Sequence, residues 1–140
     1  MMIRRETGKI YLPESECPIG PELTRESFLV SSLSQGAKIG VQNEPWCSYC
    51  LAPVGVAGTR FYIMLYFHSQ KLERVTLTDA HPRFGTSWAD VTEEKMTQQK
   101  EQNDTWLKVW NLLPALYSWG RVENSVDLHN MESSIIFSYR

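Results

Sequence analysis

The sequence predicts a single α+β domain in which an antiparallel sheet carries one long and one short helix on one face. Three observations predict this class. The apolar run Phe61–Phe67 precedes a short connector and an amphipathic strand, a long capped helical segment follows, and alternating residues after Gly120 indicate a second hairpin. The 140 residues suffice for one domain, 1–140, of which we expect residues 1–7 to be frayed.

Composition and charge exclude several function classes. The chain is 42% hydrophobic and 21% charged, which is ordinary for a globular protein. Its 14 basic and 16 acidic residues give a net charge of -2, and the basic residues are scattered, so we expect no nucleic-acid partner. No apolar stretch has the length of a signal peptide or a membrane span, which predicts a cytoplasmic protein with no membrane partner. Three cysteines, an odd number, do not suggest a disulfide framework.

The N-terminal half is expected to alternate short strands with one short helix. Lys9–Leu12 is a candidate first strand, and Thr24 is a candidate N-cap for a helix of roughly three turns that ends before Gly36. Ala37–Val41 is a candidate second strand. Trp46–Ala52 is expected to be extended, and the proline and glycines after it favour an edge strand or a loop.

The central hairpin is predicted from the run Phe61–Phe67, the connector Ser69–Lys71 and the amphipathic strand Val75–Leu77. Side chains alternate between the two faces of a strand. One face is expected to form the core: Phe61, Ile63, Leu65 and Phe67. The other face carries Tyr62, Met64, Tyr66 and His68.

The long helix is predicted from about Val91 to Leu112. Ser87 with Asp90, and Asp90 with Glu93, have capping-box spacing. One stripe of the helix is expected to face the sheet: Met96, Gln99, Asn103, Trp106, Leu107 and Trp110. The first half is otherwise so polar that we expect it to face solvent on most sides, while the end rich in tryptophan packs on the sheet.

The tail from Gly120 to Tyr139 is predicted to form a second hairpin. Alternating apolar residues define one face of each strand: Val122, Val126 and Leu128 on the first, and Ile135, Phe137 and Tyr139 on the second. The turn is expected at 129–132.

A Trp-Cys-x-x-Cys string at Trp46–Cys50 resembles the active site of thioredoxin-like oxidoreductases, where the first cysteine begins a helix. Here Pro53 and Gly55 follow, so no helix can form, and structural cysteines are the favoured interpretation. A zinc site needs a second ligand pair with metal spacing, and the sequence has none. We therefore expect no metal and no cofactor.

Catalytic motifs are also missing, since the chain has neither a nucleophile elbow nor a phosphate-binding glycine loop. His68, Asp79 and His81 follow two strand ends, where they form either an acid–base pair at a pocket mouth or solvated loop residues. The second interpretation is favoured. We assign no catalytic residue and expect a binding protein rather than an enzyme.

The aromatic residues can either fill the core or lie exposed on a binding surface. Those near the end of the long helix either fill the core or serve a partner surface, and tyrosines on the sheet's free face suit a dimer. We expect Tyr49, Tyr62, Met64 and Tyr66 to point away from the core. The candidate binding residues are Tyr49, Tyr62, Tyr66, His68, Trp106, Trp110 and Trp119.

The tail carries one resemblance. Trp119-Gly120-x-Val122, then Asp127, then Ser134-Ile135-Ile136-x-x-Tyr139 is similar to the end of small bacterial proteins carried on mobile elements such as integron gene cassettes. Some small acidic α+β proteins of this kind are toxin-immunity proteins. The similarity covers about a third of the chain, and no functional residue carries over.

The resemblance implies a binding role. The function expected is a non-enzymatic protein-binding module, either an immunity-like inhibitor or a self-associating cassette protein. Its partner is expected to be a second copy, giving a homodimer, or a different protein. The alternative is a small-molecule binder or an enzyme with a pocket between the long helix and the sheet, which would take a small apolar ligand.

Overall fold

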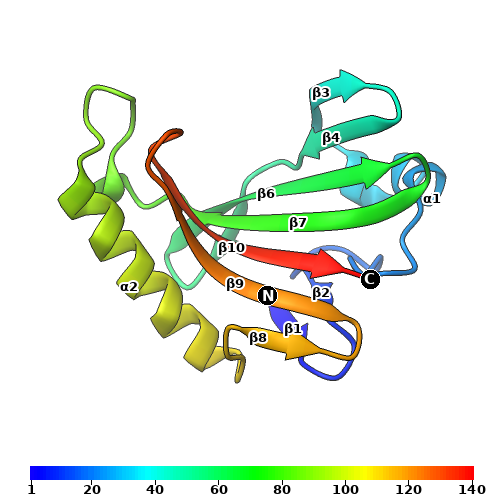
Figure 1. The fold of residues 1–140 in the computed structure, drawn as a ribbon. Helices are drawn as coiled ribbons and strands as arrows, with labels where there is room; N and C mark the ends of the chain where they lie inside the picture. Colours follow the sequence, from blue (N-terminus) through cyan, green and yellow to red (C-terminus); the bar gives the residue numbers. More distant parts are fainter.

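A large antiparallel sheet dominates the computed structural model, which describes residues 1–140 and confirms the α+β class (Figure 1). The eight-stranded sheet has the order β3-β4-β6-β7-β10-β9-β8, and β5 pairs with β6 outside this order. Its strands are β3 (Lys38–Asn43), β4 (Trp46–Cys50), β5 (Val54–Val56), β6 (Thr59–His68), β7 (Lys71–Asp79), β8 (Ala115–Tyr117), β9 (Gly120–Asp127) and β10 (Glu132–Tyr139).

The N-terminus forms a small second sheet in which β1 (Met2–Arg4) pairs with β2 (Lys9–Tyr11). The expectation that residues 1–7 are frayed is therefore wrong. Ile3 lies opposite Ile10 in this pair, and both side chains are buried in the main core. The burial of these two isoleucines ties the N-terminal segment to the rest of the protein.

The central hairpin forms as predicted, with β6 and β7 joined by a turn at Ser69, whose positive φ of 54° reverses the chain. Alternate residues of β6 have no exposed surface, and these are the four predicted core residues Phe61, Ile63, Leu65 and Phe67. The strand has this strict inside–outside pattern because only one of its two faces is covered.

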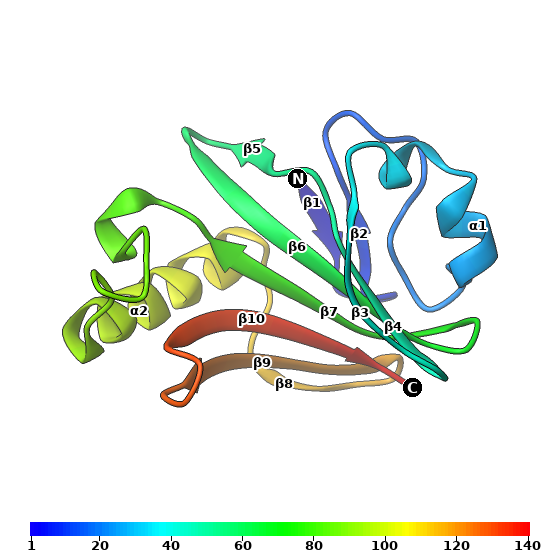
Figure 2. The ribbon, with the colours of Figure 1, turned by 90° about the horizontal axis from the view of Figure 1, so that it is seen from above.

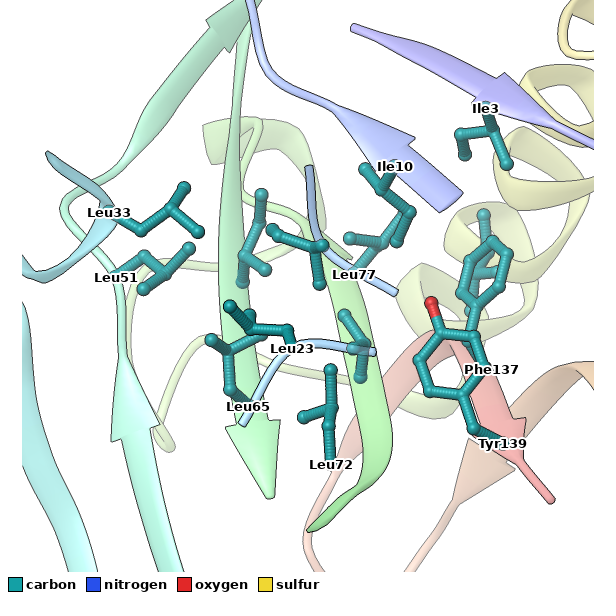
Figure 3. Packing of buried hydrophobic residues seen from close by; sticks show 14 of the residues in the cluster. Ile3, Ile10, Leu23, Leu33, Leu51, Leu65, Leu72, Leu77, Phe137 and Tyr139 are labelled. Atoms are coloured by element: carbon teal, nitrogen blue, oxygen red, sulfur yellow. The ribbon is translucent and has the colours of Figure 1, made fainter. Parts of the chain in front are cut away.

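All of the covering elements pack on this one face, as predicted. The N-terminal segment contributes Ile10 and Leu23, and Figure 3 shows Leu23 beside Leu65 and Leu72 of the central hairpin. The helices are α1 (Arg25–Leu29) and α2 (Glu93–Val109), with short 3-10 helices η1 (Ser32–Ser34) and η2 (Pro82–Phe84). Figures 1 and 2 show α1 and α2 at opposite ends of the sheet, with β1 and β2 between them.

The first helix is shorter than predicted. Thr24 caps it as expected, because its side chain accepts a hydrogen bond from the Ser27 amide. The helix ends after five residues at the C-cap Val30, and Ser31 then caps η1. The predicted three turns are thus an α-helical and a 3-10 segment, because Ser31 begins a new local hydrogen-bond pattern instead of continuing the helix.

The long helix also begins and ends at other residues than predicted. Thr92 is the N-cap and accepts from the Lys95 amide, so neither predicted capping box forms. Asp90 instead accepts from the Thr86 amide and pairs with the Lys95 ammonium at 2.7 Å. The helix stops before Asn111, whose φ of 55° is left-handed.

The polar half of α2 faces solvent on most sides, as expected, since Thr97, Gln98, Lys100, Glu101 and Asp104 are exposed, while its stripe residues Gln99 and Asn103 contact the sheet. Gln99 donates its amide to the Asp79 carbonyl at 2.9 Å, and Asn103 donates to the Ser133 hydroxyl at 3.2 Å. Both side chains are buried, together with Met96 and Leu107 of the same stripe. The predicted stripe is therefore correct, but polar contacts join part of it to the sheet.

The tail hairpin is confirmed as β9 and β10. Its core face is more limited than predicted, since Val122 is buried while Val126 and Leu128 are exposed. The second strand matches the prediction fully, because Ile135, Phe137 and Tyr139 are all buried. No helix in the structure combines the length and apolar character needed to cross a membrane.

Candidate functional site

The face of the large sheet opposite α1 and α2 carries no helix, and we call it the open face. Strand alternation and pairing register place twelve side chains on it from four adjacent strands. They are Tyr62, Met64 and Tyr66 of β6; Arg74, Thr76 and Thr78 of β7; Ser134, Ile136 and Ser138 of β10; and Arg121, Glu123 and Ser125 of β9.

The middle of the open face is apolar. Met64 lies opposite Thr76, and Thr76 lies opposite Ile136 on the next strand, so these side chains form one row across three strands. Tyr66 directs its hydroxyl to the Met64 sulfur at 3.6 Å, and Tyr62 keeps 49% of its surface exposed. The row and the two tyrosines form a continuous group of apolar and aromatic side chains.

Tyr66 is partly covered by these neighbours, and burial raises the pKa of its hydroxyl. The negative charge of Glu132 acts in the same direction. The Tyr66 side chain is therefore neutral at physiological pH. It offers a flat aromatic ring with a single hydroxyl, the kind of side chain that often anchors protein interfaces.

A depression of about 440 Å³ marks one end of the open face. It is lined by Trp46, Tyr66, Glu73, Arg74, Arg121, Ser138 and Tyr139. Trp46 is 47% exposed and packs edge-on against His68 with 4.7 Å between ring centroids. Arg121 pairs with Glu123 at 3.5 Å, whereas Arg74 has no ion pair. This end combines an exposed indole with an unpaired guanidinium.

The opposite end of the open face is acidic. Glu132 and Asp127 lie opposite each other on β10 and β9. Glu132 accepts a hydrogen bond from the Thr78 hydroxyl at 3.3 Å and pairs with no cation. Asp127 accepts from the amides of His129 and Asn130 in the hairpin turn, and the hydrogen bonds from Asn130 hold the pKa of its carboxyl below the ordinary value.

No protein-family model matches this chain, and neither a curated protein nor a solved structure is significantly similar to it.

Further depressions lie away from the middle of the open face. One of about 380 Å³ is formed by segments 12–15, 32–35 and 51–55. Another, of about 760 Å³, lies between the β5–β6 turn and the loop after β7, and includes Arg60, Tyr62 and His81. Neither of these two brings a carboxylate to a histidine, and no three His, Cys, Asp or Glu side chains cluster as metal ligands anywhere in the chain.

Three of the predicted binding residues lie on the free side of the sheet, namely Tyr62, Tyr66 and His68. Tyr49 does not, which corrects its predicted orientation. It is 5% exposed, packs on Phe28 at 4.9 Å between centroids, and accepts a hydrogen bond from Arg25 at 3.0 Å. Tyr49 pairs with Leu65 in the register, so it points to the core side, and burial raises its pKa.

The predicted tryptophans belong to the packing on the covered side of the sheet, Trp106 and Trp110 against Phe61 and Trp119 against Phe137 and Tyr139. Trp110 and Trp119 are each 8% exposed, and Trp106 is half-buried against Phe61 at 5.1 Å. Trp119 donates its indole N–H to the Arg5 carbonyl at 2.7 Å. Of the two interpretations left open, core and partner surface, the core is correct for Trp110 and Trp119.

The predicted grouping of His68, Asp79 and His81 does not form. Asp79 lies opposite Phe61, and His68 is seven residues further along β6, roughly 23 Å away at the other end of the strand. His68 lies beside the turn that joins β6 to β7, whereas Asp79 lies at the far end of β7. The hairpin therefore keeps these two side chains apart. His81 caps η2 instead, with its Nδ1 accepting the Arg83 amide at 3.2 Å.

The two cysteines of the Trp-Cys-x-x-Cys string point to opposite sides of β4. Cys47 lies opposite Phe67 and is buried on the core side, whereas Cys50 lies opposite Met64 on the free side. Residues three apart on a strand cannot approach each other as they do at a helix N-terminus. The geometry therefore agrees with structural cysteines.

Sequence reasoning missed four residues of this surface. Ile136 and Arg74 follow from strand alternation once β7 and β10 are known to be neighbours, so a partial signal existed. Arg121 and Trp46 come from strands on opposite sides of the central pair. No local pattern places these two residues in one depression.

Proposed function

We propose that this protein is a non-enzymatic cytoplasmic binding module that holds another protein against its open face. One observation carries the proposal. Met64, Thr76 and Ile136 form a row between Tyr62 and Tyr66 on a sheet face that no helix covers, and Met64 and Ile136 keep part of their surface exposed there. An apolar group of this kind on a face without a covering helix is typical of an interaction surface.

The composition of the open face supports the proposal. Aromatic residues, methionine and arginine are enriched in the centres of protein interfaces, and Tyr62, Tyr66, Met64 and Arg74 are of these types. Two hydroxyls of the face, those of Thr78 and Ser134, are already paired with each other at 2.7 Å. Since these polar groups keep their partners when water leaves, covering them costs little.

The helix–sheet packing favours a binding protein over the alternative of a pocket between α2 and the sheet. Met96, Asn103 and Leu107 are at most 1% exposed there. The nearby carboxylate of Asp79 receives hydrogen bonds from Thr59, His81 and Trp106. A carboxylate with these structural partners is not placed to take a proton from a ligand.

The partner would be a protein with an apolar or aromatic surface of its own. The resemblance of the tail to cassette-borne bacterial proteins suggests two forms of this function, an immunity-like inhibitor of another protein or a self-associating protein. Both use the same face.

A capture experiment with a matched control tests the proposal. Wild type and Tyr62→Glu are immobilised and exposed to lysate of the native host, and bound proteins are identified by mass spectrometry. Tyr62 is the most exposed aromatic residue of the open face, so the charge should abolish capture without affecting the core. The control is Val30→Glu, at a site 84% exposed beside α1 on the other side of the sheet.

Partners lost with Tyr62→Glu and retained with Val30→Glu support the proposal. A captured protein that both variants retain, with both variants folded by circular dichroism, contradicts binding at the open face.

A further inference from the structure

We propose that the protein bound at the open face is a second copy of this chain, packed face to face about a two-fold axis that runs across the strands. This inference rests on the proposed function and adds the identity and orientation of the partner. The distribution of charge over the open face carries it.

Charges are separated along the strands. Arg74 and Arg121 lie in the row of Ser138, at one end of the face. Glu132 and Asp127 lie next to the hairpin turn at the other end, and the Glu132 carboxylate reaches the row of Thr78 and Ser134, four residues and about 13 Å along β10 from the row of Arg74. The apolar row of Met64, Thr76 and Ile136 lies between them.

One charge at each end has no ionic partner within the chain. Arg74 is exposed and makes no ion pair, and Glu132 is exposed with only hydroxyl donors, from Thr78 and Ser134. Arg121 and Asp127, in contrast, are engaged with Glu123 and with the hairpin turn. The chain thus presents one free guanidinium and one free carboxylate on the same face, on the neighbouring strands β7 and β10.

Only one orientation of a symmetric pair uses both free charges. A two-fold axis along the strands would place the two basic ends against each other, and the two acidic ends likewise. An axis across the strands reverses the second copy end to end, so that Arg74 meets Glu132 of the partner subunit. Symmetry repeats the contact, giving two ion pairs at the edges of an apolar centre.

The apolar row then packs on the same row of the second copy. Four strands and about 20 Å of strand length give a footprint on the order of 400 Å² for each copy. The two footprints together bury roughly 800 Å², which is below the range of stable complexes, so the dimer should be transient and dissociate at micromolar concentrations or above. The two pairs of opposite charges select the orientation and exclude the one in which like charges meet.

A charge-swap experiment tests the inference. Dimerisation is measured by sedimentation equilibrium between about 1 and 500 μM, a range set by the expected micromolar dissociation. Arg74→Glu and Glu132→Arg should each weaken the dimer at least tenfold, because each places like charges together. The double variant, Arg74→Glu with Glu132→Arg, restores opposite charges and should recover most of the affinity. Lys108→Glu, on the exposed side of α2, gives the same change in net charge as Arg74→Glu and should leave the dimer intact.

The outcomes separate this inference from the proposed function. A wild-type protein that stays monomeric at the highest concentration overturns the second copy as partner, whereas loss of captured partners with Tyr62→Glu would still support binding at the open face. A dimer that neither single variant weakens, or that the double variant fails to restore, overturns the proposed orientation. If Glu132→Arg does not fold, Arg74→Glu decides alone, since Arg74 makes no hydrogen bond or ion pair that the fold would lose.

Discussion

Trp106 of α2 donates its indole N–H to the buried carboxylate of Asp79 at 2.9 Å. The other carboxylate oxygen accepts from the Thr59 hydroxyl at 2.9 Å and from the His81 amide at 3.0 Å. Gln99 reaches the backbone carbonyl of the same aspartate. Asp79 therefore joins the long helix to β6, β7 and the loop after β7, and its partners explain how a carboxylate that is only 3% exposed is tolerated.

Removing the indole donor tests this connection. Trp106→Phe keeps most of the ring contact with Phe61 but leaves one oxygen of Asp79 without its partner. We expect a loss of roughly 1–3 kcal/mol in the free energy of unfolding, measured by urea denaturation. Trp88→Phe is the matched control, because Trp88 is 68% exposed. Equal stabilities for the two variants would contradict the role assigned to the hydrogen bond.

Leu65 has no exposed surface at the centre of β6 and lies between the N-terminal segment and β7 (Figure 3). Leu65→Ala should lower the free energy of unfolding by about 2–5 kcal/mol, because truncation leaves a cavity in a packed core. Leu116→Ala, at a site 75% exposed, should change it by less than about 0.5 kcal/mol. The central position of β6 is wrong if Leu65→Ala is equally mild.

The cysteines on opposite sides of β4 should not form a disulfide with each other. Under mild oxidation, intact-mass analysis is expected to show no loss of two hydrogens within the monomer. Cys50→Ser should be close to neutral because Cys50 is only partly buried, whereas Cys47→Ser should cost about 1–3 kcal/mol because it buries a hydroxyl in the core. Reduction of insulin by the protein would contradict the structural assignment.

Alkaline pH should destabilise the protein through Tyr139. Burial raises the pKa of its hydroxyl well above the ordinary value, and the hydroxyl donates to the Gly8 carbonyl at 2.7 Å. Because the pKa of Tyr139 is higher in the folded than in the unfolded state, its full contribution to the free energy of unfolding is present below the unfolded-state pKa of about 10. The free energy of unfolding then falls as the pH rises further, by up to about 1.4 kcal/mol per pH unit.

The matched variant for this prediction is Tyr139→Phe. It should be less stable at pH 7, since the Gly8 carbonyl loses its donor, but its stability should fall less between pH 10 and 11.5. Urea denaturation over this pH range measures both effects. Parallel pH profiles for the variant and the wild type would assign the alkaline loss to other groups.

The sequence predicted the elements whose signals are local. The run Phe61–Phe67 predicted the central strand, because the continuous apolar character of a segment can be recognised without knowledge of distant residues. Thr24 predicted the start of the short helix, because an N-cap side chain bonds to a backbone amide only three positions away. The end of that helix and the N-cap of α2 were misplaced, because Ser, Thr and Asp offer several competing caps within a few residues.

Local signals alone could not decide which face an aromatic residue occupies. Tyr49 points to the core because its strand pairs with β6 in a register that places it opposite Leu65, and a shift of one residue would have put it on the open face. The order β4-β6-β7-β10-β9 brings Trp46, Arg74 and Arg121 to one depression although 75 positions separate the first from the last. The sequence by itself determined the α+β class and the core of β6, through contacts between near neighbours. The tertiary structure decided which side chains share the open face, because strand order and register arise from packing between segments far apart in the chain.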